Sequence, residues 1–183
     1  MSKITLTPIA LKDLKPLIQM AFRDDPLLLT KYSLLKTEDH TPTLEESVDK
    51  NYETILEAYN DPVFKDDVNI YAIEISDKDY TRPIGFTVTI TNAEAPHILL
   101  SFGINIMYRN LKNSTKWLMA VKGILGKYIT TFLHVNNSRA IEFFEKNGFT
   151  KKVNELDVSN VTLTSNWKEV VKHAEKKEAV AHL

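Results

Sequence analysis

The sequence predicts a single α+β domain in which helices flank a mixed, mostly antiparallel sheet. With 183 residues, 43% of them hydrophobic and 26% charged, the chain has the size and composition of one soluble globular domain. Segments whose apolar residues alternate, as in half-buried strands, are interspersed with segments whose apolar residues have helical spacing. The resulting order is β-α-α-β-β-β-α-β-α-β-β followed by a helical tail, and no internal repeat or linker divides it.

The first half of the chain carries five such segments. They are a strand at 3–9, helices at 11–22 and 43–59, and strands at 68–75 and 84–90, which a polar connection joins as an antiparallel hairpin. Pro26 disfavours helical geometry at the residue before it, so the segment 23–32 is expected to break the first helix. Thr43 and Glu46 have the spacing of a capping box, which predicts the start of the second helix.

The second half begins with a long β run at 97–107, in which Gly103 is a candidate β-bulge. It continues with a helix over 117–125 capped by Ser114 or Thr115, a strand at 128–135, a helix over 138–146 and strand-like pieces at 150–158 and 161–164. Residues 165–183 have the pattern of a charged helix. We therefore expect one domain over 1–164 and a helical tail over 165–183, through which a homodimer could assemble.

Composition excludes several classes of protein. Cysteine is absent, which excludes disulfides, thiolate catalysis and cysteine-ligated metal sites. The five histidines lack metal-ligand spacing, so no metal is expected. The first residues lack the apolar region of a signal peptide, and no run approaches the roughly 20 apolar residues of a membrane span. With a pI of about 6.5, these features predict a cytoplasmic protein with neither membrane nor nucleic-acid partners.

The charge is distributed unevenly, although the net charge is only −1. The segment 95–141 contains no acidic residue and six basic ones, Arg109, Lys112, Lys116, Lys122, Lys127 and Arg139. Such a basic block creates a local field that attracts an anionic ligand. A solvated helix face, balanced by acids elsewhere in the fold, explains the same charges, and charge alone favours this second interpretation.

Two neighbouring stretches combine structural signals with binding potential. MYRNLKNSTKW (107–117) leads from the long β run into a helix, whose N-terminus presents free N–H groups beside basic side chains. As a site this loop would cradle a diphosphate; as structure it is a polar crossover with a Ser/Thr cap. NNSRAIEFFEKNGF (136–149) has polar cap residues, an apolar helical stripe and a terminating Asn147-Gly148, which by themselves predict only a short amphipathic helix.

The same two stretches resemble motifs of the GCN5-related N-acetyltransferase (GNAT) superfamily. NNSRAIEFFEKNGF is similar to the signature N-x-x-A-x-x-F/L-Y-E-x-x-G-F, and INIMYRNLKNSTKW is similar to the fourth strand and acetyl-CoA loop of the family. The residues that fall on the signature are Asn137, Ala140, Phe143, Glu145, Gly148 and Phe149. The motif similarity covers residues 98–149, and the order of elements agrees over residues 4–164.

The resemblance implies a sheet whose fourth and fifth strands splay to admit acetyl-CoA. The pantetheine would pair with the backbone near Ile104 and Ile106. Asn137 would bond to the cofactor arm, and Phe144 would lie near the thioester sulfur. An amine would attack the acetyl carbonyl directly, and a base or a water chain would remove its proton. The diphosphate would bind at the loop residues Arg109, Asn110, Leu111, Lys112, Asn113, Ser114 and Thr115.

Two features depart from the family pattern. The loop of the family reads Q/R-x-x-G-x-G/A, whereas Lys112 and Ser114 fill both glycine positions here and would restrict close approach of a phosphate. Phe144 stands where the family often has a tyrosine that protonates the departing thiolate. Two hypotheses follow: an N-acetyltransferase acting on an unidentified small-molecule or peptide amine, or a GNAT-like module that binds a ligand or protein without turnover.

No motif identifies a catalytic residue. His97 and His134 stand at strand ends and are candidates for a base, although a lone histidine there is more often structural. Tyr108 is a candidate for the missing acid, although tyrosines beside strands usually pack. The acceptor region of the family corresponds to 23–32 and 44–59. Its acidic residues, Asp24, Asp25, Glu45 and Glu46, are interpreted as ordinary loop and first-turn acids rather than as an amine site.

Overall fold

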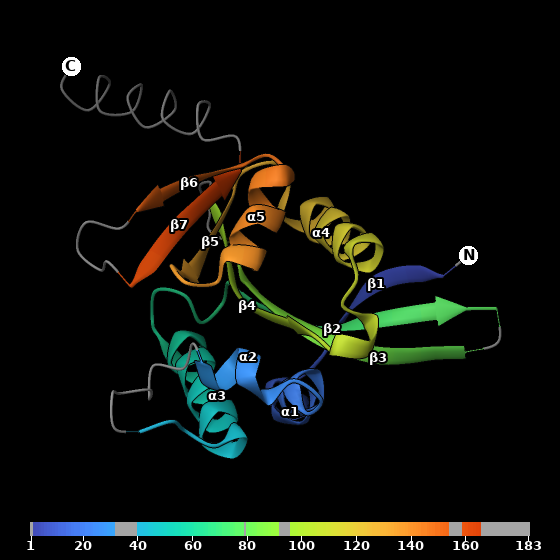
Figure 1. Cartoon of the computed structure of the whole chain (residues 1–183), viewed down its shortest axis with the longest axis horizontal. Helices are drawn as coiled ribbons and strands as arrows, with labels where there is room; N and C mark the ends of the chain where they lie inside the picture. The colour runs from blue at the N-terminus through green and yellow to red at the C-terminus, as the bar shows by residue number, and fades with distance from the viewer. Residues whose placement is uncertain (1, 32–39, 79, 92–95, 154–158, 166–183) are drawn as a thin grey trace.

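The computed structural model describes residues 2–31, 40–78, 80–91, 96–153 and 159–165 (Figure 1). Within them, seven strands form one sheet in the order β1-β2-β3-β4-β5-β7-β6. Every neighbouring pair is antiparallel except β4 and β5, which run parallel. The predicted α+β class is thereby confirmed. The predicted helical tail lies outside the described residues, apart from Ser165, which ends β7.

The elements follow the predicted order with one addition, a short helix at Pro26–Lys31, and two elements begin four and six residues earlier than predicted. The strands are β1 (Lys3–Pro8), β2 (Val68–Asp77), β3 (Tyr80–Ile90), β4 (His97–Ile104), β5 (Ile129–His134), β6 (Phe149–Val153) and β7 (Asn160–Ser165). The helices are α1 (Leu14–Phe22), α2 (Pro26–Lys31), α3 (Leu44–Asn60), α4 (Leu111–Leu125) and α5 (Ser138–Lys146), with 3-10 turns η1 (Leu11–Asp13) and η2 (Ile106–Tyr108). No described helix is both long and apolar enough to cross a membrane.

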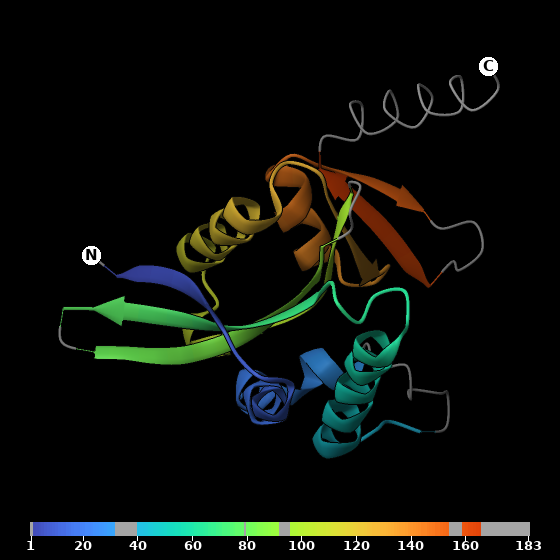
Figure 2. The ribbon, with the colours of Figure 1, turned by 180° about the vertical axis from the view of Figure 1, so that it is seen from behind.

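The helices cover the two faces of the sheet unequally. The helices α4 and α5 lie on one face, and α1, α2 and α3 lie on the other (Figures 1 and 2). The first face buries a core that includes Trp117, Leu118 and Val121 of α4. The second buries a core that includes Ile18 of α1 and Ile55 of α3. The sheet is therefore the middle layer of three, with an apolar core on each side.

Local signals in the sequence set several element boundaries. The Thr43 hydroxyl accepts from the Glu46 N–H at 3.2 Å, and the Glu46 carboxylate accepts from the Thr43 N–H at 2.7 Å. This reciprocal pair is the predicted capping box of α3. The start of α5 is capped by Asn137, whose side chain accepts from the Ala140 N–H. Gly148 follows α5 with a φ of +87°, a left-handed geometry that glycine adopts without a Cβ clash.

One local expectation was incomplete and two were wrong. The segment 23–32 does end α1, but a second helix, α2, begins within it at Pro26, because proline suits the first helical position. The bulge of β4 lies at Leu100 rather than at Gly103: Leu99 pairs with Thr89 and Ser101 pairs with Val88, so Leu100 has no partner on β3. The β run also stops at Ile104, before the predicted end at residue 107, because the chain turns there into η2.

Gly103 provides a test of the packing around β4. A Cβ atom there would lie 2.9 Å from ring atoms of Phe22 and Phe86. We expect Gly103→Ala to lower the free energy of unfolding by about 1–3 kcal/mol, because the rings must move. Gly123→Ala on α4 is the matched control, since a Cβ there meets nothing within 4 Å and should stabilise the helix by about 1 kcal/mol. Urea denaturation measures both, and a Gly103→Ala variant as stable as wild type would contradict this packing.

Candidate functional site

The parallel pair β4–β5 is short, and its strands separate. Its register consists of His97–Ile129, Ile98–Thr130 and Leu99–Thr131. At the last pair, the Thr131 hydroxyl donates to the Leu99 carbonyl oxygen at 2.9 Å. From Leu100 onward β4 pairs with β3 alone, and the bulge at Leu100 bends it locally. The two strands are therefore open to each other along the second half of β4.

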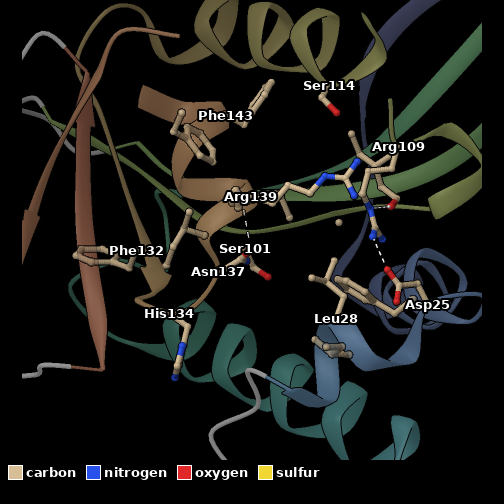
Figure 3. A pocket seen from close by; sticks show the side chains of 18 of the residues that line it. Asp25, Leu28, Ser101, Arg109, Ser114, Phe132, His134, Asn137, Arg139 and Phe143 are labelled. Atoms are coloured by element: carbon tan, nitrogen blue, oxygen red, sulfur yellow. Dashed lines mark hydrogen bonds and ion pairs between the residues drawn. The ribbon is translucent and has the colours of Figure 1, made fainter. Parts of the chain in front are cut away.

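A cavity of about 740 Å³ occupies this opening (Figure 3). On one face of the sheet it is lined by the region of α1, α2 and α3, including Phe22, Asp25, Leu28, Ser47, Lys50, Asn51 and Thr54. On the other face it is lined by the starts of α4 and α5, including Arg109, Asn110, Leu111, Ser114, Asn137 and Arg139. Residues of β4 and the end of β5 lie between these groups. The cavity thus connects the two faces through the gap in the sheet.

The start of α4 forms one wall of the cavity. The helix begins at Leu111, because the Asn110 side chain accepts from the Asn113 N–H at 3.0 Å, and not after a Ser114 or Thr115 cap as predicted. The N–H groups of Leu111 and Lys112 have no acceptor among the described residues. Figure 3 shows the Ser114 hydroxyl pointing toward the cavity. The wall therefore offers several hydrogen-bond donors beside the positive end of a helix dipole.

Arg109 spans the cavity wall and ties it to the opposite face of the sheet. Its Nε donates to the Ile104 carbonyl oxygen at 2.9 Å, and its Nη1 donates to the Asp25 carboxylate at 2.7 Å. Its Nη2 is buried and has no acceptor among the described residues. The arginine thus has a structural role and keeps one buried donor unused, which a ligand oxygen could accept.

A second tie lies beside this ion pair. The Asn105 amide nitrogen donates to the Asp24 carboxylate and to the Met20 carbonyl oxygen, each at 2.9 Å. Its amide oxygen accepts from the Met107 N–H at 3.0 Å. The Asn105 amide holds the pKa of Asp24 below its ordinary value, and the Arg23 guanidinium acts in the same direction. The turn between α1 and α2 is therefore attached to the end of β4 by Asn105 as well as by Arg109.

The start of α5 forms the facing wall. Asn137 lines the cavity and also caps the helix. Figure 3 shows Arg139 extending from this first turn into the cavity, toward the side where Arg109 lies. At the far end of the helix, Lys146 and Glu142 also line the cavity and form an exposed ion pair at 3.2 Å. Arg139 is thus a cation aimed at the same space as the donors of α4.

Aromatic rings close the bottom of this half of the cavity. Phe144 is fully buried, and its ring centroid lies 4.9 Å from that of Phe149, 5.5 Å from Phe143 and 5.7 Å from Phe102. Phe102 in turn lies against Trp117 at 4.9 Å. No tyrosine is among the described residues that line the cavity. This wall is apolar and carries no hydroxyl acid.

Comparisons with known proteins agree with this geometry at the level of fold. No family model and no curated protein matches the sequence. The solved structure of an acetyltransferase from Thermus thermophilus matches with a TM-score of 0.62 and 16% identity, over 88% of this chain and 96% of that one. A GNAT-family protein from Chromobacterium violaceum matches with a TM-score of 0.58 and 14% identity, over 88% and 81%. The protein has the GNAT fold.

A further structure with the GNAT fold was solved with a ligand. The PaiA N-acetyltransferase from Thermoplasma acidophilum, in complex with coenzyme A, matches with a TM-score of 0.58 and 21% identity, over 89% of this chain and 98% of that one. The fold that the sequence motifs implied is therefore confirmed. At these identities the comparisons establish the fold, and the chemistry has to be argued from this chain's own residues.

The residues at the open edge of β4 are Phe102 and Ile104, two positions earlier than the Ile104 and Ile106 that the motif implied. The Asn105 N–H donates to the Ile84 carbonyl oxygen on β3. Because alternate residues of an antiparallel strand face opposite edges, Phe102 and Ile104 direct their N–H and C=O groups toward the opening. Ile106 lies in η2, is 43% exposed and is not among the lining residues. Phe102 therefore shares the open edge with Ile104.

The other predicted residues divide between wall and scaffold. Ile104, Arg109, Asn110, Leu111, Ser114, Asn137 and Phe144 line the cavity, whereas Lys112, Asn113 and Thr115 do not. Lys112 and Ser114, at the glycine positions of the family loop, both lie in the first turn of α4. Their backbone is helical there, so neither position needs the positive φ that glycine permits. Asn113 is buried and donates to the Tyr108 carbonyl oxygen at 3.0 Å.

Among the catalytic candidates, His134 alone lines the cavity. Its Nδ1 accepts from the Asn136 N–H at 3.2 Å, which places the ring hydrogen of the neutral form on Nε2. His97 starts β4 and is not a lining residue. The Tyr108 ring packs beneath the Arg82 guanidinium at 4.9 Å, also outside the cavity. The structure therefore retains His134 and gives His97 and Tyr108 structural positions.

The basic block predicted from the sequence is largely dispersed by folding. Lys116 donates to the Ser2 carbonyl oxygen, and Lys122 donates to the Asn147 carbonyl oxygen at 2.9 Å. Of the six basic residues, Arg109 and Arg139 line the cavity. The basic block therefore contributes two arginines, rather than all six of its cations, to the lining of the cavity.

Three of the four acids named in the acceptor region have structural partners. Asp24 bonds to Asn105 and Asp25 to Arg109, while Glu46 belongs to the capping box, whose bonds from Thr43 hold the pKa of its carboxyl low. The sequence analysis did not identify the side of α3 that lines the cavity. Its residues Ser47, Lys50, Asn51 and Thr54 line the cavity. Their i, i+3, i+4, i+7 spacing was a readable signal, although polar stripes of that kind usually face solvent.

The Arg109–Asp25 bond can be tested by stability measurements. Both side chains are mostly buried, with 19% and 26% of their surfaces exposed. We expect Asp25→Asn to lower the free energy of unfolding by about 1–2 kcal/mol, because it leaves the guanidinium without its anionic partner. Asp66→Asn, at an exposed turn position, should change it by less than about 0.5 kcal/mol. A double-mutant cycle with Arg109→Met measures the coupling, and additive effects would show that the ion pair contributes nothing.

Proposed function

We propose that this protein is an N-acetyltransferase that transfers an acetyl group from acetyl-CoA to a primary amine. The observation that carries the proposal is the cavity that crosses the sheet between β4 and β5. A donor bound against α4 and α5 and an acceptor bound against α1–α3 would meet in that gap. The fold shared with acetyltransferases, one of them solved with coenzyme A, supports the same assignment.

The residues on the α4–α5 side suit a diphosphate-bearing donor. The N–H group of Leu111, the Ser114 hydroxyl and the Arg139 guanidinium, all on lining residues, are donors for phosphate oxygens. The backbone groups of Phe102 and the N–H of Ile104, whose carbonyl oxygen already accepts from Arg109, would pair with the amide groups of a pantetheine arm, as a strand edge pairs with an added strand. Bound acetyl-CoA would supply an activated thioester carbonyl at the gap.

The transfer needs little acid–base assistance from the chain. The amine nitrogen forms a bond to the acetyl carbon while the carbon–sulfur bond breaks, and the nitrogen gives up one proton. Because the tautomer of His134 has its hydrogen on Nε2, this histidine is suited to orient an acceptor oxygen rather than to take that proton. Water is then the proton acceptor, and a thiol with a pKa of about 8.5 is able to leave as the thiolate.

One observation favours a second candidate function. The wall that Phe144 forms is fully buried and has no hydroxyl, and the two described carboxylates that line the cavity, Asp25 and Glu142, are both paired with cations. A cavity whose described lining carboxylates are both paired also suits a module that binds coenzyme A or another ligand without turnover. Binding and transfer are therefore tested separately.

Binding is tested by thermal shift with coenzyme A. A ligand that binds only the folded state raises the unfolding free energy by about 2.7 kcal/mol at a hundredfold excess over its dissociation constant. We expect a concentration-dependent rise in Tm that Arg139→Ala reduces. Arg23→Ala is the matched control, because Arg23 is exposed and lies outside the cavity. An unchanged Tm at millimolar coenzyme A would overturn the donor assignment.

Transfer is tested by release of coenzyme A from acetyl-CoA over a panel of amines. The chain has no cysteine, so a thiol-reactive chromophore reports the released thiol without background from the protein. We expect kcat/KM to rise tenfold per pH unit below the pKa of the amine acceptor, because the neutral amine is the nucleophile and no chain residue removes its proton. Tight binding of coenzyme A without turnover of any amine would favour the binding module.

A further inference from the structure

The side of α3 that lines the cavity is polar. A polar stripe on a helix usually faces bulk solvent, whereas this one faces the cavity. Ser47, Lys50, Asn51 and Thr54 all line the cavity from one side of the helix. The Asn51 side chain accepts from the Ser101 hydroxyl at 3.3 Å, which joins this face to the bulged part of β4. The stripe therefore borders the gap in the sheet from the side opposite to α4 and α5.

Ser47 has an unsatisfied hydroxyl within this stripe. The residue is 2% exposed, and its hydroxyl has no hydrogen-bond partner among the described residues. A buried polar group without a partner costs free energy, and native structures rarely keep one without a reason. A ligand oxygen in the cavity would satisfy it.

Charge on this side of the cavity is positive. Lys50 has 30% of its side chain exposed and makes one long contact, 3.7 Å, with Glu53, which is 60% exposed and is not a lining residue. The carboxylate that this side contributes to the described lining, that of Asp25 in the turn between α1 and α2, is paired with Arg109 at 2.7 Å. Among the described residues, nothing on this side presents a free carboxylate to a cationic ligand.

We propose that this α3 face, with Lys50 and Ser47 as its key residues, binds an oxyanion on the acceptor, so that the acceptor is an amine that also carries a carboxylate or a phosphate. The assignment rests on the proposed transferase function and specifies its substrate class. Lys50 pairs with the anionic group, and the Ser47 hydroxyl donates to one of its oxygens. The amine of the same molecule is then directed toward the gap in the sheet. Polyamines and other acceptors without an anion are disfavoured by Lys50.

The experiment compares amines matched except for the anion, and kcat/KM is expressed per neutral amine, because loss of the anion also lowers the pKa of the amine. L-serine is paired with L-serinamide, and glucosamine 6-phosphate with glucosamine, so that one pair probes a carboxylate and the other a phosphate. Acetyl transfer is measured as released coenzyme A. We expect the anionic member of at least one pair to have the higher kcat/KM, about 10- to 100-fold, the value of a charge-assisted hydrogen bond. Equal rates within both pairs, or faster acetylation of spermidine, would overturn the inference.

Variants of Lys50 test whether this residue causes the preference for anionic amines. Lys50→Met should lower the ratio of kcat/KM for the anionic amine to kcat/KM for its partner toward one, through a higher KM for the anionic amine. Lys50→Arg should retain this ratio. Lys65→Met is the matched control, because Lys65 is exposed on the turn after α3 and outside the cavity. An anion preference that survives Lys50→Met unchanged would also overturn the inference.

Ser47→Ala separates a binding role from a structural one. Because the hydroxyl has no partner among the described residues of the free protein, its removal should leave the Tm of the free protein unchanged or slightly raised, while the KM for the anionic amine rises. A lower Tm with an unchanged KM would assign Ser47 to the scaffold and count against the proposed site.

The failure of this inference can be told apart from the failure of the proposed function. Thermal shift is measured with glucosamine 6-phosphate and L-serine, with and without coenzyme A, in wild type and Lys50→Met. A shift with coenzyme A but none with either anion overturns the α3 site alone. A Lys50-dependent shift with an anion but none with coenzyme A supports the α3 site and overturns the acetyl-CoA assignment.

Discussion

The hydrogen bond from the Thr131 hydroxyl to the Leu99 carbonyl oxygen marks the last position at which β4 and β5 lie side by side. Beyond it, the bulge at Leu100 bends β4, and the edge of that strand faces a cavity instead of a neighbouring strand. Backbone groups on an open edge require partners. Arg109 satisfies the Ile104 carbonyl oxygen and leaves the remaining groups of that edge to solvent or ligand.

A sheet divided in its middle depends on its two helical layers. On one face, Trp117 and Phe144 pack against Phe102 of β4 and fill the base of the opening. The side chains of Asn105 and Arg109 reach past the end of β4 to the turn between α1 and α2 on the other face. Asn105 and Arg109, which attach the end of β4 to the turn between α1 and α2, therefore also join the two halves of the cavity. A substitution at Asn105 or Arg109 is therefore expected to change both halves of the cavity.

Local chemistry made much of the fold predictable. Alternating apolar residues and the capping box of Thr43 identified β2 and α3 within two residues of their observed ends, because these signals act within one element. The boundaries that failed depended on competition between neighbouring signals. Asn110 caps α4 ahead of Ser114 and Thr115. The bulge at Leu100 reflects pairing with β3, which no local pattern reports.

The sequence by itself determined the α+β class, the order of the elements and the two stretches that border the cavity, because side-chain periodicity and caps act over a few residues. Only the tertiary structure decided which charges face the cavity. Folding paired Arg109 with Asp25 and attached Lys116 and Lys122 to carbonyl oxygens, while it turned Lys50 and Ser47 of an ordinary amphipathic helix toward the gap in the sheet. The reason is physical: a charged or polar group acquires its role from partners that are distant in sequence and meet only when the layers pack.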